Sequence, residues 1–231
     1  MLDRWFRETP LGRQVAAAER HFCAQALGQI DRGHVAVVGA PLGAITHKPG
    51  LQEWELGESG HVIGRAAQLP FRAHSLDALL LVHVLDFNDD PDAVLAQAYQ
   101  CLRSGGTLVA LTFNPISLWG ARRLVGRLQG AAAPWGGSQW LASSVGVYMR
   151  RHGFETEATR FLCFLPPGAS RLQNGANPWE YVGPRLGRLG AGVQATLASR
   201  QDPGVVSGRG LFASVPVPGP RRGVQPAGRC A

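Results

Sequence analysis

The sequence has little that would anchor the chain in a membrane or cross-link it. Its longest uninterrupted apolar runs, such as Ala78 to Val82, are five residues long, whereas a helix needs roughly 20 such residues to cross a bilayer. The four cysteines show no paired spacing, which argues against a disulfide framework or a cysteine-rich zinc site. No apolar core follows the charged residues at the N-terminus, so no secretory signal is predicted. We therefore expect a cytoplasmic protein.

Lysine is almost absent, because only Lys48 among the 23 basic residues is a lysine. The formal net charge is +7, but residues 203–231 carry four arginines and no acid, and so contribute +4 of it. Residues 1–202 carry only +3 and are nearly balanced. Binding to nucleic acid through the basic tail is therefore an open alternative that the sequence does not favour.

Several motifs of hydrolytic enzymes are also missing. The sequence contains no His-x-x-x-His, Cys-x-x-Cys or phosphate-loop pattern, so metal-dependent and nucleotide hydrolysis lack support and no metal site is predicted. Gly-x-Ser-x-Gly is absent as well, which removes the usual serine hydrolase turn.

What is present is an alternation of strand and helix patterns. Apolar runs predict strands at 35–39, 61–66, 76–85, 107–113 and 192–200, and periodicity predicts helices at 11–30, from Asp90 to Leu102, near 119–128 and near 141–152. Such alternation predicts an α/β fold with a doubly wound, mostly parallel sheet. We expect one domain over residues 1–202, with an N-terminal helix, and a disordered tail rich in Pro, Gly and Arg over 203–231.

The segment 69–120 contains an ordered set of features. They are Leu-Pro-Phe at 69–71, a Ser75-x-Asp77 turn, an apolar strand, a helix that begins at Asp90-Pro91, a Gly105-Gly106 turn and a further strand. In this order they resemble small class I S-adenosylmethionine-dependent methyltransferases. The stretch FNPISLWGARR at 113–123 is similar to a subgroup of uncharacterised bacterial methyltransferase-like proteins. The resemblance implies a Rossmann-like fold, S-adenosylmethionine as cofactor and methyl transfer to an unknown, small organic acceptor.

The resemblance also implies a cofactor site on the loops that follow the strands. The residues concerned are Gly39, Leu42, Gly43, Arg65, Ala66, Gln68, Leu69, Val82 and His83. Unlike the family pattern, the loop VVGAPLG has no acid and contains Pro41, which lacks a backbone N–H donor. Arg65 stands at a position where members of the family often have an Asp. The 17 residues between Gly43 and His61 are too few for a helix, a strand and a second helix, so the sheet is expected to be reduced between its first and third strands. Glu53, Glu55 and Glu58 are then candidates to bind the ribose.

These departures leave a second reading open. In it, the chain is a degenerate methyltransferase-like protein that does not turn over the cofactor and acts as a binding or regulatory module, with RNA as one partner.

Two residues are candidates for catalysis. His83 stands at the end of an apolar strand and could accept a proton from the acceptor. A purely structural role for this histidine is the alternative. Asn114 could orient the acceptor by hydrogen bonds, and turn formation at Asn-Pro is the alternative. Asp77 is expected to position the entrance of its strand.

Aromatic and arginine side chains suggest how an acceptor could be covered. Trp119, Arg122 and Arg123 begin a predicted helix and could receive an anionic or aromatic acceptor or form a solvated face. The residues that could form a lid are Trp135, Trp140, Trp179 and Tyr181. Because the predicted active face has few acids, the sequence favours a small or medium organic acceptor over a cationic one.

Overall fold

The computed structural model describes residues 2–45, 48–57, 62–131, 134–167 and 183–202. The helices are α1 (Leu2–Glu8), α2 (Pro10–Ala26), α3 (Val84–Phe87), α4 (Pro91–Cys101), α5 (Leu118–Leu128) and α6 (Ala142–Arg151), with a 3₁₀ segment η2 (Gly183–Leu189). The strands are β1 (Gly33–Gly39), β2 (Leu51–Leu56), β3 (Leu76–Val82), β4 (Leu102–Phe113), β5 (Phe154–Leu162) and β6 (Val193–Arg200). The predicted tail at 203–231 lies outside the described residues.

The strands form one sheet in the order β2-β1-β3-β4-β6-β5. The first four strands in this order are parallel to one another, while β6 is antiparallel to β4 and β5 is antiparallel to β6. This arrangement confirms the mostly parallel α/β sheet predicted from the sequence. No helix stands between β1 and β2 among the described residues of that connection, which agrees with the expected reduction.

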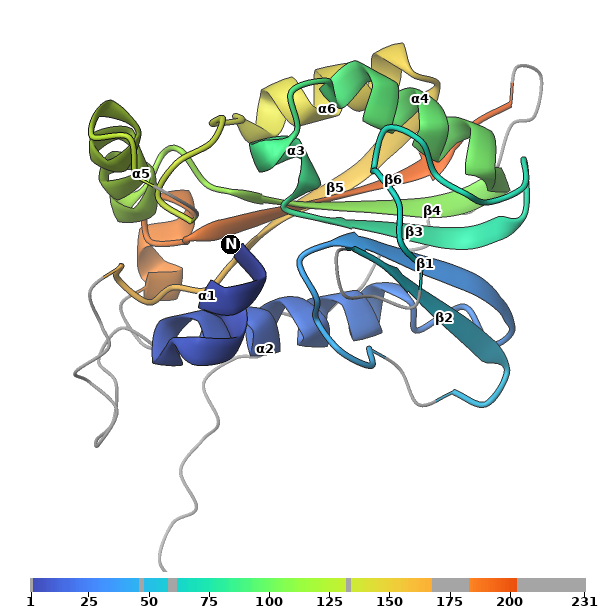
Figure 1. Cartoon of the computed structure of the whole chain (residues 1–231), viewed down its shortest axis with the longest axis horizontal. Helices are drawn as coiled ribbons and strands as arrows, with labels where there is room; N and C mark the ends of the chain where they lie inside the picture. Colours follow the sequence, from blue (N-terminus) through green and yellow to red (C-terminus); the bar gives the residue numbers. More distant parts are fainter. Residues whose placement is uncertain (1, 46–47, 58–61, 132–133, 168–182, 203–231) are drawn as a thin grey trace, which may run out of the picture.

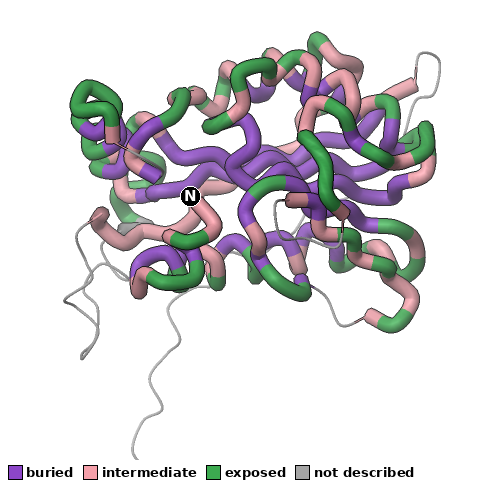
Figure 2. Tube along the Cα trace, in the orientation of Figure 1, coloured by how far each residue is buried: buried purple, intermediate pink, exposed green. Residues whose placement is uncertain are grey.

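Helices cover both faces of the sheet. In Figure 1, α1 and α2 lie on one side of the sheet and α3, α4 and α6 on the other. One apolar cluster joins the first face to residues such as Val15 and Phe22 of α2, and a second joins the other face to Val94 and Leu95 of α4 and Met149 of α6. The central strands β1, β3, β4 and β6 are largely buried, while the outer surfaces of the helices are exposed (Figure 2). Burial on both faces explains why β3 is apolar almost throughout.

The ends of the helices follow from local chemistry. Asp90 caps α4 by accepting a hydrogen bond from the Ala93 amide at 2.9 Å, and Pro91 occupies the first turn, as the Asp-Pro signal predicts. In the same way Thr9 caps α2 with a bond of 3.0 Å from the Gly12 amide.

Four sequence-based boundaries were wrong. The strand expected at 107–113 is β4, which begins already at Leu102, so the predicted Gly105-Gly106 turn lies within it. The second strand is Leu51–Leu56, whereas the predicted strand at 61–66 makes only isolated bridges at Val62 and Arg65 in its described part. The single N-terminal helix expected at 11–30 is replaced by α1 and α2, and α1 was not predicted at all. The strand expected at 76–85 ends at Val82, because His83 has a φ of 56°, which is incompatible with a continuing strand.

The described residues contain no helix that is both long and apolar enough to span a membrane. They also contain no cluster of side chains suited to hold a metal ion.

Candidate functional site

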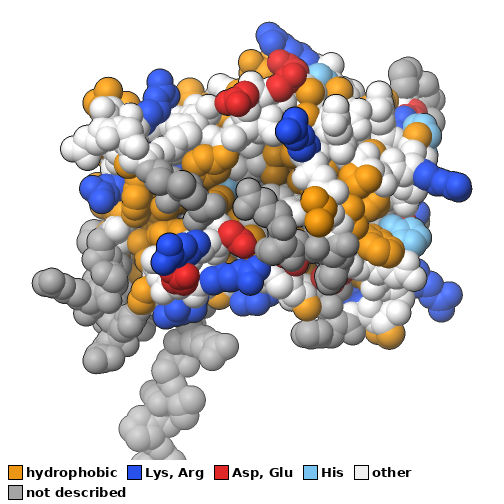
Figure 3. Space-filling view, viewed as in Figure 1, with side chains coloured by type: hydrophobic (Ala, Val, Ile, Leu, Met, Phe, Trp, Pro, Cys, Tyr) orange, Lys and Arg blue, Asp and Glu red, His pale blue; other side chains and the backbone are white. Residues whose placement is uncertain are grey.

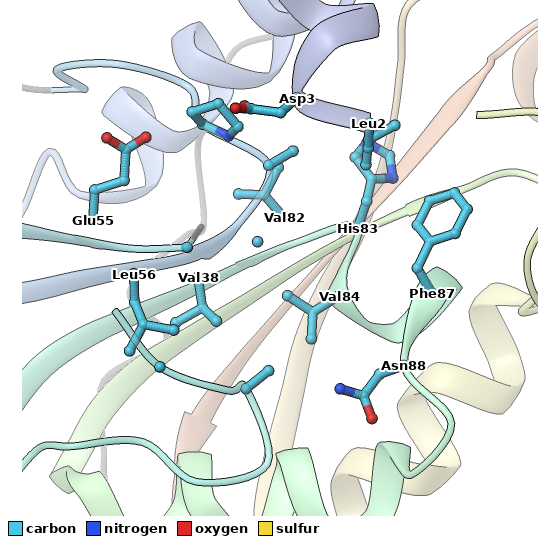
Figure 4. A pocket seen from close by; sticks show the side chains of 16 residues that line it. Leu2, Asp3, Val38, Glu55, Leu56, Val82, His83, Val84, Phe87 and Asn88 are labelled. Atoms are coloured by element: carbon cyan, nitrogen blue, oxygen red, sulfur yellow. The ribbon is translucent and has the colours of Figure 1, made fainter. Parts of the chain in front are cut away.

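A cavity of about 500 Å³ lies where the carboxyl ends of β1, β2 and β3 meet. The chain leaves β1 toward β2 on one side and later enters β3 on the other, so the loops after β1 and β3 diverge at this point. Open α/β sheets bind ligands at such a switch point. The lining comes from these strand ends, from α1 and from the segment around α3 (Figure 4). It consists of Leu2, Asp3, Val38, Gly39, Ala40, Pro41, Glu55, Leu56, Gly57, Gly64, Ala66, Val82, His83, Val84, Phe87 and Asn88.

The turn after β1 requires glycine. Gly39 has a φ of +106°, and a Cβ built on it would lie 2.3 Å from the carbonyl oxygen of Val82. No side chain fits so close to a neighbouring backbone, so the turn brings β1 and β3 together directly under the cavity. Pro41 also lines the cavity, as expected from its place in the loop.

The end of β2 contributes an acid to the cavity. Of the three glutamates considered from the sequence, Glu55 lines the cavity. Glu53 instead accepts a hydrogen bond from the Ile45 amide at 2.9 Å, and Glu58 lies outside the described residues. The carboxylate of Glu55 is a suitable acceptor for hydroxyl groups of a ligand.

Helix α1 supplies a second acid that sequence reasoning missed. Leu2 and Asp3 both line the cavity from above the strand ends (Figure 4), and Asp3 pairs with Arg7 at 3.5 Å. The helix is held by aromatic contacts of Trp5 with Trp119, at 6.2 Å between ring centroids, and of Phe6 with His83, at 5.7 Å. The sequence did contain a signal for this helix, because Trp5 and Phe6 stand among charged residues and would favour a helix that packs one side against the domain. The cavity thus holds two carboxylates, contrary to the expectation of an active face with few acids.

His83 lies at the centre of a buried charge network. Its Nε2 is 2.7 Å from Glu19 Oε1 of α2 and its Nδ1 is 2.9 Å from Asp86 Oδ2 of α3, and all three side chains are fully buried. Burial lowers the pKa of His83, but the charge of Glu19 and the hydrogen bonds of both carboxylates raise it more strongly, and the resulting pKa is about 9. The ring is therefore protonated at neutral pH and donates from both nitrogens. In that state it has no lone pair with which to accept a proton from a substrate.

Arg123 of α5 completes this network. It lies 3.6 Å from Asp86 Oδ1 and is buried, with its guanidinium 4.4 Å from the centroid of Phe113. It also donates to the carbonyls of Pro134 and Ser138. The network therefore pairs two carboxylates with two cations.

Asn114 ties the end of β4 to the segment before β6. Its Nδ2 donates to the carbonyl of Ala191 at 2.9 Å and to that of Arg188 at 2.5 Å, while its Oδ1 accepts from the Ile116 amide at 3.0 Å. The side chain is buried and does not line the cavity. These bonds give Asn114 a structural position, and its predicted contact with an acceptor stays a prediction.

The structure divides the predicted cofactor residues into three groups. Gly39, Ala66, Val82 and His83 line the cavity. Leu42 and Leu69 are buried in the two apolar clusters. The others, which are exposed and do not line the cavity, are Gly43, Arg65 and Gln68.

The aromatic and arginine residues proposed for the acceptor side are mostly structural. Trp119 is buried and its Nε1 donates to the carbonyl of Leu165 at 2.6 Å, so neither it nor Arg123 belongs to a solvated helix face. Arg122 is exposed and lies over the ring of Trp135 at 5.0 Å.

One further aromatic residue and one acid can be placed. Trp140 donates to the carbonyl of Leu85 at 2.8 Å, whereas Trp179 and Tyr181 lie outside the described residues. Asp77 accepts from the His34 amide at 2.8 Å and pairs with Arg103 at 2.6 Å, which agrees with a role at the entrance of its strand.

Comparison with known proteins adds an independent line of evidence. A family model described as a methyltransferase domain matches residues 46–110. The uncharacterised protein YafS of Escherichia coli is 46% identical over 57 residues, which is 25% of this chain and 24% of that protein. The chain thus matches about a quarter of the length of this relative.

Solved structures share the fold at low sequence identity. A SAM-dependent methyltransferase from Thermotoga maritima superposes with a TM-score of 0.57 at 19% identity, covering 86% of this chain and 94% of that one. A SAM-dependent methyltransferase from Archaeoglobus fulgidus superposes with a TM-score of 0.54 at 14% identity, covering 78% of this chain and 94% of that one. The [4+2]-cyclase SpnF superposes with a TM-score of 0.56 at 15% identity, covering 79% of this chain and 80% of that one. Because SpnF is a cyclase, the fold alone does not determine the reaction. The chain therefore has the class I methyltransferase fold, and its residues 46–110 are similar to a methyltransferase domain.

Proposed function

We propose that the chain binds S-adenosylmethionine in the cavity at the ends of β1, β2 and β3 and transfers its methyl group to a small organic acceptor. The observation that carries this proposal is the cavity itself, which combines a glycine turn at Gly39 with the carboxylate of Glu55 at the switch point of the sheet. The methyltransferase domain match over 46–110 includes Glu55 and Val82. A cytoplasmic location is part of the same proposal.

The lining suits such a cofactor. Glu55 would accept hydrogen bonds from the ribose hydroxyls, and the small residues Gly57, Gly64 and Ala66 leave room for a flat ring beside Leu56. When bound, the cofactor supplies a methyl group activated by a positively charged sulfur. A displacement of this kind depends above all on alignment of the reacting atoms. The chain's contribution is therefore to hold both molecules and to exclude water.

The acceptor would be held between α1 and the segment around α3. Leu2 and Phe87 offer apolar contact, while Asp3 and Asn88 offer polar groups. Asp3 extends the proposal to amines, which the sequence disfavoured, because a carboxylate can replace part of the water around a cation. In this proposal His83 and Asp86 are positioning residues, since they fix the start of α3 and thereby Phe87.

Calorimetry and thermal unfolding with S-adenosylmethionine and its demethylated product test the cofactor site. Ligand at 100 times its dissociation constant should stabilise the chain by about 2.7 kcal/mol. Glu55→Gln should weaken binding, whereas Gln52→Ala, at an exposed position on the same strand, serves as the matched control. If neither ligand binds at millimolar concentration, the proposal is wrong and a binding or regulatory module without turnover remains.

A methyl donor with a labelled methyl group, incubated with cell extract, tests the acceptor. We expect label in small soluble molecules. Label confined to RNA or protein would contradict the small acceptor, and label in RNA would favour RNA association through the basic residues.

A further inference from the structure

Helix α5 turns an apolar face toward solvent. At about 100° per residue, its residues Leu118, Ala121, Leu124, Val125 and Leu128 fall within one arc of about 120°. The four larger ones are 46% to 81% exposed. The opposite side, with Trp119, Arg123 and Gly126, is the side buried against the domain. The helix therefore has one face buried against the domain and one apolar face exposed to solvent, and the exposed face is not part of the core.

The segment η2 extends this surface. Leu186 and Leu189 are 45% and 55% exposed, and together with Leu118 they line a second, smaller cavity of about 230 Å³. Asn114 fixes η2 beside the start of α5 through its bond to the Arg188 carbonyl. In Figure 1 both elements lie at the same end of the molecule, and in Figure 2 the coil of α5 is largely exposed.

The charges on this surface have one sign. Arg122 and Arg127 lie at the two edges of the apolar arc of α5, and Arg185 and Arg188 alternate with the leucines of η2, all four being exposed. Neither element contains an Asp or Glu. On the face seen in Figure 3, the end of the molecule around α5 shows hydrophobic and basic side chains without acidic ones. We call these four arginines and the six exposed apolar residues Leu118, Leu124, Val125, Leu128, Leu186 and Leu189 the Leu-Arg surface.

We propose that the Leu-Arg surface binds the surface of an anionic membrane. A helix with one apolar face and arginines at its edges can bury that face at the level of the lipid headgroups, while the guanidinium groups reach the phosphates. Anionic lipids attract such cations strongly at short range. Complementarity of charge distinguishes this occupant from a second copy of the chain, whose equivalent surface would bring eight arginines together.

Sedimentation with vesicles tests this proposal on the full chain without any cofactor. We expect binding to vesicles of equal parts phosphatidylcholine and phosphatidylglycerol, and little binding to phosphatidylcholine alone. Leu124→Ser combined with Leu128→Ser should weaken binding about tenfold or more, and Arg127→Gln about fivefold. Matched controls are Ile63→Ser, at a position 84% exposed, and Arg72→Gln, also at an exposed position; both should bind like the unaltered chain.

Three outcomes would overturn the proposal. The first is an unaltered chain that binds neither kind of vesicle. The second is equal binding by the surface variants and the controls, since the arginines at 203–231 would then account for it. The third is a dimer in sedimentation velocity that Leu128→Ser dissociates while vesicles are not bound, which would assign the surface to a second copy. Far-UV circular dichroism of each variant confirms that the altered positions, all exposed, leave the fold intact.

Discussion

Alkaline pH should destabilise the folded protein through His83. Its pKa is about 9 in the folded chain, against 6.5 for an unperturbed histidine. The stability that the protonated ring contributes is therefore fully present below pH 6.5 and is lost as pH rises through about 9. The difference corresponds to about 3 kcal/mol. Between these two values the folded state binds more protons than the unfolded state, so the free energy of unfolding should fall by up to about 1.4 kcal/mol per pH unit.

The substitution Glu19→Gln isolates the cause. Burial alone lowers the pKa of His83, and the charge of Glu19 is the largest influence that raises it. Without that charge the pKa of His83 should fall, and the slope between pH 6.5 and 9 should become smaller, although Asp86 still raises the pKa. At low pH the variant should be less stable by about 3 to 5 kcal/mol, the usual cost of breaking a buried pair. The two curves should approach each other at high pH, where His83 is neutral in both proteins.

Urea unfolding across this pH range measures both effects, with Glu8→Gln as a control because Glu8 belongs to an exposed pair with Arg4. Titration of the His83 ring by NMR gives the pKa directly. Equal slopes in the unaltered chain and in Glu19→Gln, or a ring that titrates near 6.5, would refute the reasoning.

Three further predictions concern the cavity and its support. Glu55→Gln should weaken binding of S-adenosylmethionine by about 1 to 3 kcal/mol in calorimetry; unchanged affinity would remove Glu55 from the site. Gly39→Ala should destabilise the chain by about 2 kcal/mol or more in urea unfolding, because its φ is +106° and the new Cβ meets the Val82 carbonyl; a stable variant would show that this turn can rearrange. Trp119→Ala should cost about 3 to 5 kcal/mol by the same assay, since the ring is buried, and a loss below 1 kcal/mol would contradict its role in packing.

The sequence predicted the parts of the fold whose local signals and final environment agree. The β1 and β3 runs are apolar because both faces of the sheet are covered, and the Asp90-Pro91 signal marks the start of α4 where the cap is observed. The strand β2 was missed because it lies at the edge of the described sheet, where β1 is its neighbour. Its acids Glu53 and Glu55 disfavour a strand locally, and only the parallel pairing with β1 makes them compatible with one.

The candidate site, too, was predicted only where local sequence signals determine the position of a residue. Gly39 and Val82 follow from their strands, so chain order was enough to place them at the cavity. Asp3 could not be placed, because its position depends on the packing of Trp5 and Phe6 against distant aromatic rings. The same holds for Glu19 and Arg123, which meet around His83 and Asp86 from two different helices. Long-range contacts of this kind leave no periodic trace in the sequence.

The strand order has a consequence for how the chain is made. β6 lies between β4 and β5, and among the strands that the structure describes β5 pairs only with β6. During synthesis, residues 154–162 leave the ribosome before the strand that must separate them from β4 exists. One side of β4 therefore stays unpaired until residues 193–200 arrive, and completion of the sheet waits for a segment close to the end of the described chain. Such late insertion makes folding slow and leaves the incomplete sheet prone to aggregation. Although β6 is far from the cavity in sequence, its insertion is therefore the step after which the edge of β4 can no longer pair with another molecule.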